Sequence, residues 1–422
     1  MIQQLRPTIA LLSAVALLGL ANSLLFVLLG VRMAIDEVSS EMTGIVGSAY
    51  FVGMLLGSLY GARVIRRVGH IRAFTVFAAV SAIAVLIKVL FTVVWVWAFM
   101  RVAAGFCSAA MFIIAESWLQ AQATNETRGR TYAMYALFGT LGAGAGPLLI
   151  NLGDPTGNEL FVIAALILML CLLPVALTRV SNPSMAEEKR FGIRALFALS
   201  PVAVVGAFSA GLVTSAMSAL GPTYGERIGL STAYIAFFLM GMRLGSFVMQ
   251  YPVGALSDHF DRRRVMISLA SCAATISFVL FFTGTVNPIA VLVLGFLFGG
   301  VNQPLYGLSV AHANDFAEED SFVSVSAGLL LGYGLGASVG PSLAAPVMGW
   351  AGPAGLFLYA GVILVITVAF IIYRSTRRAP VGTDEQGHYI TVHPSLMGSG
   401  VRLDPRGAER FASGKREDAN LG

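Results

Sequence analysis

Charged residues are scarce in this sequence. Of its 422 residues only 12% are Asp, Glu, Lys or Arg, whereas 57% are hydrophobic, and the mean hydropathy is +0.79. A soluble domain carries about 25% charged residues, because a surface in water must be largely polar. The shortage of charge therefore excludes an ordinary water-soluble fold and indicates a protein whose outer surface faces lipid.

Cysteines and paired reactive groups are also few. Cys107, Cys171 and Cys272 each lie in an apolar run without paired spacing, so we expect no disulfide framework and no metal site. No zinc-type His–Glu pattern, Ser–His pair or pair of acids falls inside an apolar run, which argues against an enzyme and a cofactor. The net charge of +5 is spread over short basic clusters, which indicate membrane topology rather than binding to nucleic acid.

Apolar runs of about 20 residues, enough to cross a bilayer as a helix, follow one another along the chain. The first of them is longer than the ~7–15-residue core of a signal peptide and lacks a clear cleavage site, so we expect it to be retained. The sequence thus predicts an all-α integral membrane protein with twelve transmembrane helices. We place these at Thr8–Gly30, Met42–Ala62, Ile71–Leu90, Val94–Leu119, Thr131–Leu152, Leu160–Leu177, Pro201–Pro222, Ala233–Leu256, Val265–Phe282, Pro288–Ala313, Phe322–Met348 and Ala354–Tyr373.

Basic residues are distributed unevenly between alternate connections. With the N-terminus inside, the inner segments up to Arg378 hold 17 basic residues, and the outer loops hold only Arg32 and Arg227. Because basic residues concentrate in cytoplasmic loops, both termini are predicted to be cytoplasmic. We expect a multi-pass protein of the plasma membrane, which is the inner membrane of a bacterium, acting as a monomer.

The chain divides into two similar halves. A polar linker at 179–197 separates a six-helix half at 1–178 from a second at 198–373. GTLGAGAGP ends at Pro147 and GLGASVGP ends 194 residues later at Pro341, while GSLYG and GALSD begin 197 residues apart. Such a duplication places a substrate site between the repeats, near the middle of the bilayer. The polar, glycine-rich tail at 374–422 shows no periodicity, and we predict it to be disordered rather than docked.

The loop after the eighth apolar run has the sequence GALSDHFDRRR. Its glycine permits close helix contact, and its aspartate and arginines can form ion pairs that exist in one conformation only; the alternative is an ordinary basic loop. We call such a conformation-dependent set of ion pairs a latch. The first-half copy has Gly61 where the aspartate would stand, so whether this copy also acts as a latch is undecided. We predict a cytoplasmic gate from both copies, made of Gly254, Asp258, Arg262, Arg263, Gly57, Arg66 and Arg67.

GALSDHFDRRR resembles the motif that major facilitator transporters carry between their second and third helices and repeat between the eighth and ninth. VIRRVGHIR, ESWL, TRGR, LTRVSNPS and QYPVGALSD are similar to the YcaD-like branch of that superfamily. The resemblance covers nearly all spans and omits the tail. It implies the major facilitator fold and a latch that stabilises the outward-open state, but it brings no substrate.

The fourth apolar run contains an arginine and a glutamate. Arg101, Gly105 and Ala109 share one helix face, and an arginine inside a membrane normally faces a cavity or a partner; snorkelling to the interface is the alternative. The resemblance implies a role for Arg101 in proton coupling. Glu116 is the one acidic residue that we place within a span, so it is the candidate proton carrier. A structural ion pair with an arginine at the cytoplasmic side is an equal alternative.

Arg243 is predicted to lie near mid-membrane in the eighth run, without an acidic neighbour in sequence. Such a charge meets the substrate or pairs with a distant helix, and Glu116 is the available partner. With Arg101 it makes the interior positive, which slightly favours an anionic or zwitterionic substrate. Polar residues of other runs are candidates to line the same cavity with Arg243, namely Asn22, Asn302, Gln303 and Tyr306.

Two glycine–proline pairs, Gly146–Pro147 and Gly340–Pro341, stand in the fifth and eleventh runs. Proline bends a helix and glycine admits a close neighbour, so we predict helix hinges there. The first pair also resembles a motif of exporters in the superfamily, which leaves export and uptake both open.

Together these features predict a secondary active transporter that moves a small organic solute by alternating access, coupled to protons. The alternative is a membrane sensor that retains the transporter fold without transporting.

Overall fold

The structure, a computed structural model, describes residues 2–123, 127–176, 192–283, 287–318, 321–377 and residue 389. Every regular element within this described part is helical. The first half contains α1 (Ile2–Ile35), α2 (Ser40–Val68), α3 (His70–Leu90), α4 (Val94–Gln122), α5 (Arg128–Ala145), the 3₁₀ helix η1 (Gly146–Leu152), α6 (Glu159–Leu170) and α7 (Leu172–Ala176). The rest comprises α8 (Ile193–Leu199), α9 (Pro201–Arg227), α10 (Thr232–His259), α11 (Arg262–Thr283), α12 (Pro288–Asn302), α13 (Pro304–Asn314), α14 (Phe322–Ala351) and α15 (Gly355–Ser375).

The predicted spans are confirmed, because the described residues contain 12 helices long and apolar enough to cross a membrane. Several helices extend past the predicted ends. α1 reaches Ile35 and α2 reaches Val68, because a helix satisfies its own backbone hydrogen bonds beyond the apolar region as well as within it. The tenth span, Pro288–Asn314, is interrupted where Gln303 separates α12 from α13. Pro304, which follows the interruption, has no backbone N–H to continue the helix.

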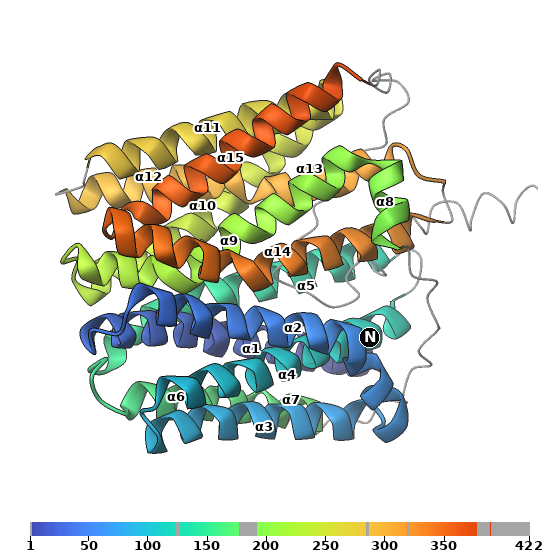
Figure 1. The fold of residues 1–422 in the computed structure, drawn as a ribbon. Helices are drawn as coiled ribbons and strands as arrows, with labels where there is room; N and C mark the ends of the chain where they lie inside the picture. Colours follow the sequence, from blue (N-terminus) through green and yellow to red (C-terminus); the bar gives the residue numbers. More distant parts are fainter. Residues whose placement is uncertain are drawn as a thin grey trace, which may run out of the picture.

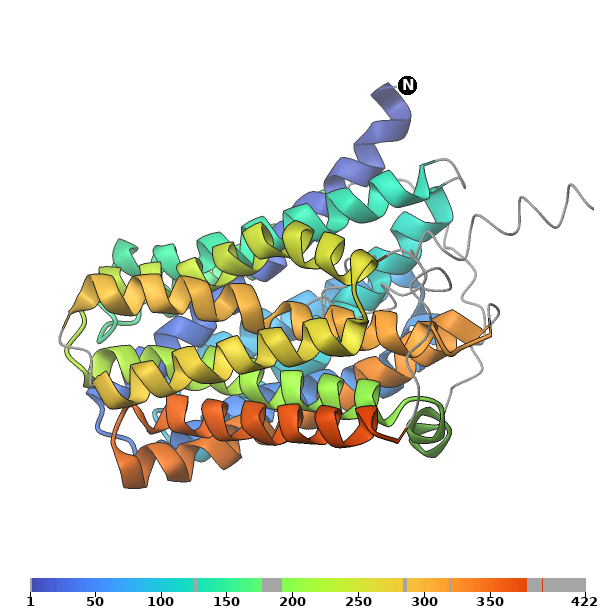
Figure 2. The ribbon, with the colours of Figure 1, turned by 90° about the horizontal axis from the view of Figure 1, so that it is seen from above.

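The two halves lie side by side, the first drawn in blue to teal and the second in green to red (Figure 1). Figure 2 shows the helices running along a common direction, with α1 leaving the bundle toward its N-terminal end. Most of α8 falls within the predicted linker, whose residues 179–191 lie outside the described part of the chain. Of the predicted tail, the structure describes residues 374–377 and Tyr389.

Equivalent glycines join equivalent helices in the two halves. A Cβ atom on Gly142 of α5 would lie 2.1 Å from the carbonyl oxygen of Ala16 on α1, and one on Gly336 of α14 would lie 2.2 Å from that of Phe208 on α9. Such contacts leave no room for a side chain. Gly142 and Gly336 belong to the repeated glycine–proline motifs, which are 194 residues apart, so this duplicated sequence folds into duplicated packing.

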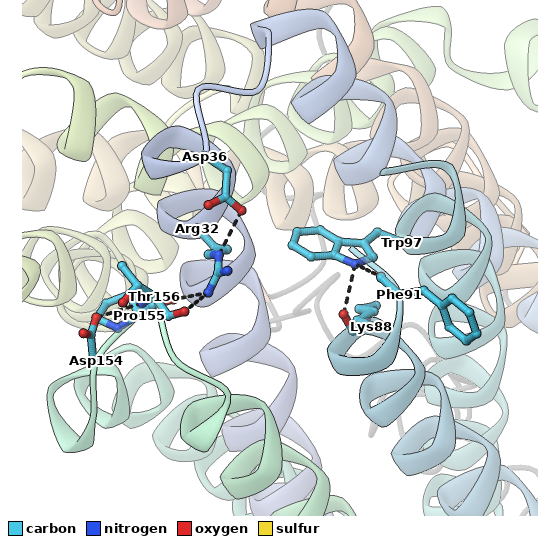
Figure 3. A network of polar contacts seen from close by, with 8 residues as sticks. All are labelled: Arg32, Asp36, Lys88, Phe91, Trp97, Asp154, Pro155 and Thr156. Carbon is cyan, nitrogen blue, oxygen red and sulfur yellow. Dashed lines mark hydrogen bonds and ion pairs between the residues drawn. The ribbon is translucent and has the colours of Figure 1, made fainter. Parts of the chain in front are cut away.

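The two ends of the bundle differ in arginine content. We call the end at which α2, α4, α10 and α15 finish the arginine-rich end, because Arg66, Arg67 and Arg262–Arg264 lie there. The opposite end, with the α1–α2 and α9–α10 connections, is the arginine-poor end. Figure 3 shows its polar contacts in the first half.

Arginine and tryptophan side chains fix the loops of the first half at the arginine-poor end. Arg32 forms an ion pair with Asp36 at 2.9 Å and donates to the carbonyl oxygens of Pro155 and Thr156 (Figure 3). Trp97 donates from its indole nitrogen to the carbonyl oxygen of Phe91 at 2.8 Å. These bonds satisfy backbone groups that the ends of helices and turns leave unpaired.

Polar contacts and close glycine packing join the halves at the arginine-poor end. Arg227 of α9 donates to the hydroxyl of Ser40 at 2.6 Å and to the carbonyl oxygen of Val38 at 2.8 Å. The hydroxyls of Ser48 on α2 and Ser342 on α14 lie 2.8 Å apart. We call these contacts the seam; it joins α1 and α2 of the first half to α9 and α14 of the second.

Candidate functional site

A cavity of about 120 Å³ lies between the two halves. Its walls come from α1, α2, α4, α5 and η1 of the first half and from α9, α10, α12 and α14 of the second. The duplicated sequence predicted a site in this position. Aromatic and small polar groups dominate the lining, which includes Phe26, Tyr50, Phe51, Phe112, Thr214, Ser218 and Tyr333.

Arg243 is the one charged residue among those that line the cavity. It projects from α10 and lines the cavity together with Tyr333 of α14. The ion pairs of the described residues do not include Arg243. The structural pairing with Glu116 that the sequence left open is therefore absent from the described part of the protein. A cation in an enclosed, partly apolar site attracts a negative group strongly.

Amide and hydroxyl groups from both halves line the same cavity. In the first half, Asn22 of α1 donates to the hydroxyl of Ser108 at 3.2 Å. In the second, the Thr214 hydroxyl donates to the side-chain oxygen of Gln303 at 3.1 Å. Asn302 is 2% exposed, and its Oδ1 has no hydrogen-bond partner among the described residues. Buried polar atoms are rarely left without a partner, so this oxygen is an open acceptor at the cavity wall.

Tyr306, predicted to line the cavity, lies behind its wall. It is 1% exposed, and its ring meets that of the cavity residue Tyr333 edge-on with 5.2 Å between centroids. Its hydroxyl has no hydrogen-bond partner among the described residues. Sequence position alone could not show this, because neighbouring residues of a helix point about 100° apart around its axis.

Arg101 also lies one layer behind the cavity. Its guanidinium carbon is 4.1 Å from the centre of the Phe26 ring and 4.4 Å from that of Tyr50, and both rings line the cavity. The side chain is 1% exposed. Two aromatic faces thus hold this buried cation by cation–π attraction, and its Nε and Nη1 have no hydrogen-bond partner among the described residues.

Glu116 lies inside the first half, between α4 and α5. It is fully buried, and the hydroxyl of Tyr135 donates to its Oε1 at 2.6 Å. Arg66, Arg67 and Arg72, its predicted alternative partners, have exposed side chains. Glu116 is not among the residues that line the cavity, so any effect it has on a bound solute passes through α4 or α5.

The predicted gate residues of the second half form a buried ion pair, but with a partner that the sequence did not single out. The Nε of Arg262 lies 2.6 Å from Oδ2 of Asp315, which follows α13. Arg263 pairs with Asp261 at 3.3 Å. Asp258 instead accepts the backbone N–H of Tyr389 at 2.7 Å.

The two predicted hinges differ in conformation. At Gly146 and Pro147 the α-helix α5 changes into the 3₁₀ helix η1, and Pro147 lines the cavity. At Gly340 and Pro341, by contrast, α14 continues without interruption to Ala351. A Cβ on Gly340 would lie 2.4 Å from the carbonyl oxygen of Leu212, so this glycine serves close packing of α14 on α9.

A sequence model of the Major Facilitator Superfamily matches residues 11–317 and 239–405. The chain belongs to the Major Facilitator Superfamily. It is 29% identical over 346 residues to the MFS-type transporter YcaD of Escherichia fergusonii, covering 81% of this chain and 89% of the relative. The YcaD protein of Shigella flexneri is 29% identical over 348 residues, with the same coverage.

Solved structures of the superfamily share the fold at low sequence identity. The nucleoside transporter NupG superimposes with a TM-score of 0.72 at 14% identity, covering 88% of this chain and 99% of that one. A bacterial homologue of the human lysosomal transporter Spinster, in an inward-facing and occupied conformation, gives 0.69 at 15% identity, covering 90% and 97%. This major facilitator protein is therefore a secondary transporter and not an enzyme.

Several residues of the site were not singled out from the sequence. Phe26 and Tyr50 both line the cavity and hold Arg101, yet aromatic residues are common in membrane spans and gave no signal. Lys88, which interrupts an apolar run in the sequence, is not among the residues that line the cavity, but it is 1% exposed near the end of α3. Its Nζ has no hydrogen-bond partner among the described residues. An unusual lysine at the edge of a span was the available clue to it.

Proposed function

We propose that this transporter carries a small organic anion or zwitterion through the central cavity by alternating access, coupled to protons. The observation that carries the proposal is Arg243, the one charged group lining a cavity otherwise built of aromatic, aliphatic and neutral polar side chains. A carboxylate or phosphate group on a small solute would complement it. The open acceptor of Asn302 would receive a donor from the same solute.

The closed seam at the arginine-poor end supports alternating access. Basic loops favour the cytoplasm, so we assign the arginine-rich end and both termini to the cytoplasmic side of a bacterial inner membrane. The seam between Ser40, Arg227 and their neighbours then closes the outer side. Transport in this scheme requires the seam to open while the arginine-rich ends of the two halves approach each other.

The environment of Glu116 supports proton coupling. A carboxyl group enclosed between α4 and α5 can exchange one proton while its hydrogen-bond partner Tyr135 stays in place. Loss or gain of that negative charge changes the packing energy of α5, which lines the cavity through Gly139 and Ala143. Arg101 acts on the same wall from behind Phe26 and Tyr50.

A binding panel on purified protein tests the substrate class. Organic anions, zwitterions, cations and neutral solutes are compared by thermal stabilisation of the wild type and of Arg243→Ala. We expect an anion or zwitterion to stabilise the wild type and to lose affinity by about 10²-fold in Arg243→Ala, since truncating one partner of a buried charge pair costs ~2–5 kcal/mol. Arg243→Lys should retain part of the affinity, because the charge remains but the planar fork is lost.

Two results would contradict the proposal. Equal stabilisation of both proteins by every anion would remove Arg243 from the site. Binding that persists in proteoliposomes without any flux of the bound solute would favour a sensor that retains the transporter fold.

A further inference from the structure

The glycine of the second-half loop motif packs against a residue of the C-terminal tail, whereas Gly57, the glycine of the first-half motif, packs against a helix. A Cβ on Gly57 of α2 would lie 2.5 Å from the carbonyl oxygen of Phe106 and 2.9 Å from the Cβ of Ala109, both on α4. A Cβ on Gly254 of α10 would instead lie 2.6 Å from Cδ1 of Tyr389. The absence of a side chain at Gly254 therefore makes room for a residue of the C-terminal tail.

Three kinds of contact hold Tyr389. Its backbone N–H donates to Asp258 at 2.7 Å, and its hydroxyl would lie 2.5 Å from a Cβ on Gly307 of α13. The two glycines, on different helices, thus leave the space that the ring fills. The ring also packs against an apolar cluster drawn from α9, α10, α11, α13 and α15, namely Val202, Val253, Val265, Met266, Leu308 and Ile371.

The space exists because α10 and α13 diverge toward the arginine-rich end. α10 packs closely along α12 but makes few contacts with α13, whereas α2 stays against α4. In the first half α4 fills the corresponding region with its own side chain, since Ile113 stands 194 residues before Gly307 and is buried. The second half has a glycine at that position, and an aromatic ring from elsewhere in the chain takes up the volume.

We propose that Tyr389 is a removable wedge that holds α10 and α13 apart and thereby keeps the arginine-rich end of the second half open. Residues 378–388 connect it to α15 and can span up to about 36 Å when extended, so the chain length allows release and return. Release lets α10 close on α13 and favours approach of the two halves at this end. The consequence for the transport cycle rests on the alternating access proposed above, whereas the docking itself does not.

Amide hydrogen exchange tests the docking in the full-length protein, followed on the peptide that contains Tyr389. We expect its amide to be protected in the wild type and to lose protection by roughly tenfold or more in Gly307→Ala, whose methyl group displaces the hydroxyl; tenfold corresponds to ~1.4 kcal/mol. The double variant Gly307→Ala/Tyr389→Phe should recover protection, because the next ring atom lies 3.4 Å from the added Cβ. Gly332→Ala is the matched control, since nothing lies within 4 Å of its Cβ position.

Spin labels test the effect on the opening. Arg67→Cys and Arg264→Cys place one label on each half at the arginine-rich end, in a background with Cys272→Ala because Cys272 is exposed. Tyr389→Ala should shift the distances between the two labels toward shorter values. The ratio of molecules with a short distance to those with a long distance should rise by about tenfold. Tyr389→Phe should leave this ratio unchanged. Unprotected exchange at Tyr389 in the wild type, or unchanged distances in Tyr389→Ala, would overturn the proposal. Neither measurement requires a known substrate, so both outcomes are independent of transport.

Discussion

The two halves of this transporter share a helical framework but carry their charges in different places. Glycines 194 residues apart make the same backbone contacts in both, at Gly142 and Gly336. The buried charges are not repeated. The position 194 residues after Arg101 is Gly295, and the one after Glu116 is Val310. In the first half the charges lie behind the cavity wall, and in the second Arg243 faces the cavity.

The two halves therefore share helix packing but not the positions of their buried charges. Close helix contacts tolerate almost no change, because a Cβ at these glycines would meet a backbone oxygen. Charged positions are free to differ once each finds an acceptable environment. We therefore expect changes of charge to affect the halves unequally and changes of packing to affect them alike.

The largest effect is expected from Glu116→Gln, which removes the carboxyl group proposed to carry the proton in the first half. Solute accumulation driven by a pH gradient in proteoliposomes should fall to background, while exchange of labelled for unlabelled solute should persist, because exchange needs no net proton movement. Glu226→Gln, which changes a carboxylate of the second half, is the control. Normal pH-driven accumulation in Glu116→Gln would assign coupling to another group.

Arg262→Ala should produce the next largest effect, on stability. The variant removes the ion-pair partner of the Asp315 carboxylate, and both side chains are nearly fully buried, at 1% and 4% exposure. Breaking a buried pair from one side costs about 3–5 kcal/mol. Thermal unfolding of the variant and of the wild type in detergent measures this loss of stability.

Arg66→Ala, in the corresponding loop of the first half, is the matched control. Its side chain is exposed, so a change within about 0.5 kcal/mol is expected. Similar losses in the two variants would show that the loops are equivalent after all.

A moderate and equal loss is expected from Gly142→Ala and Gly336→Ala. Each introduces a methyl group 2.1 or 2.2 Å from a carbonyl oxygen of the neighbouring helix, and overpacking of this kind costs about 1–3 kcal/mol. Gly144→Ala and Gly332→Ala are controls in the same helices, because nothing lies within 4 Å of either Cβ position. Unequal losses at Gly142 and Gly336 would break the equivalence of the two frameworks.

The framework was the part that the sequence could predict. Apolar runs located the spans, since lipid exposure leaves a pattern about 20 residues long, and α3 ends and α4 begins at the predicted Leu90 and Val94. Depth along a helix also follows from residue number. It put Arg243 near mid-membrane, and Arg243, Asn22, Asn302 and Gln303 all line the cavity.

The facing direction of each side chain was less predictable. Whether Tyr306 or Arg101 reaches a cavity depends on the rotation of its helix against several neighbours, which no single sequence run contains. The docking of Tyr389 depends on Gly254 and Gly307, two glycines that lie 53 residues apart and belong to different helices. The polar composition of the tail gave no indication of that contact.

The smallest expected effect concerns the seam. Arg227→Ala removes two hydrogen bonds between the halves, worth roughly 1 kcal/mol for a partly exposed group, or about a fivefold shift toward the state open at the arginine-poor end. A cysteine at the cavity position Ser218 should then react faster with an impermeant reagent added from that side. Arg32→Ala should leave this rate unchanged, because the contacts of Arg32 lie within the first half. Equal rates in both variants would exclude a special role for Arg227.

A reversible cross-link across the seam tests alternating access most directly. The hydroxyls of Ser48 and Ser342 lie 2.8 Å apart on α2 and α14, so cysteines at these positions, with Cys272→Ala, are close enough to form a disulfide. We predict that oxidation stops solute transport in proteoliposomes and that a reductant restores it, because the arginine-poor end can no longer open. Full transport by the oxidised, cross-linked protein would contradict the account.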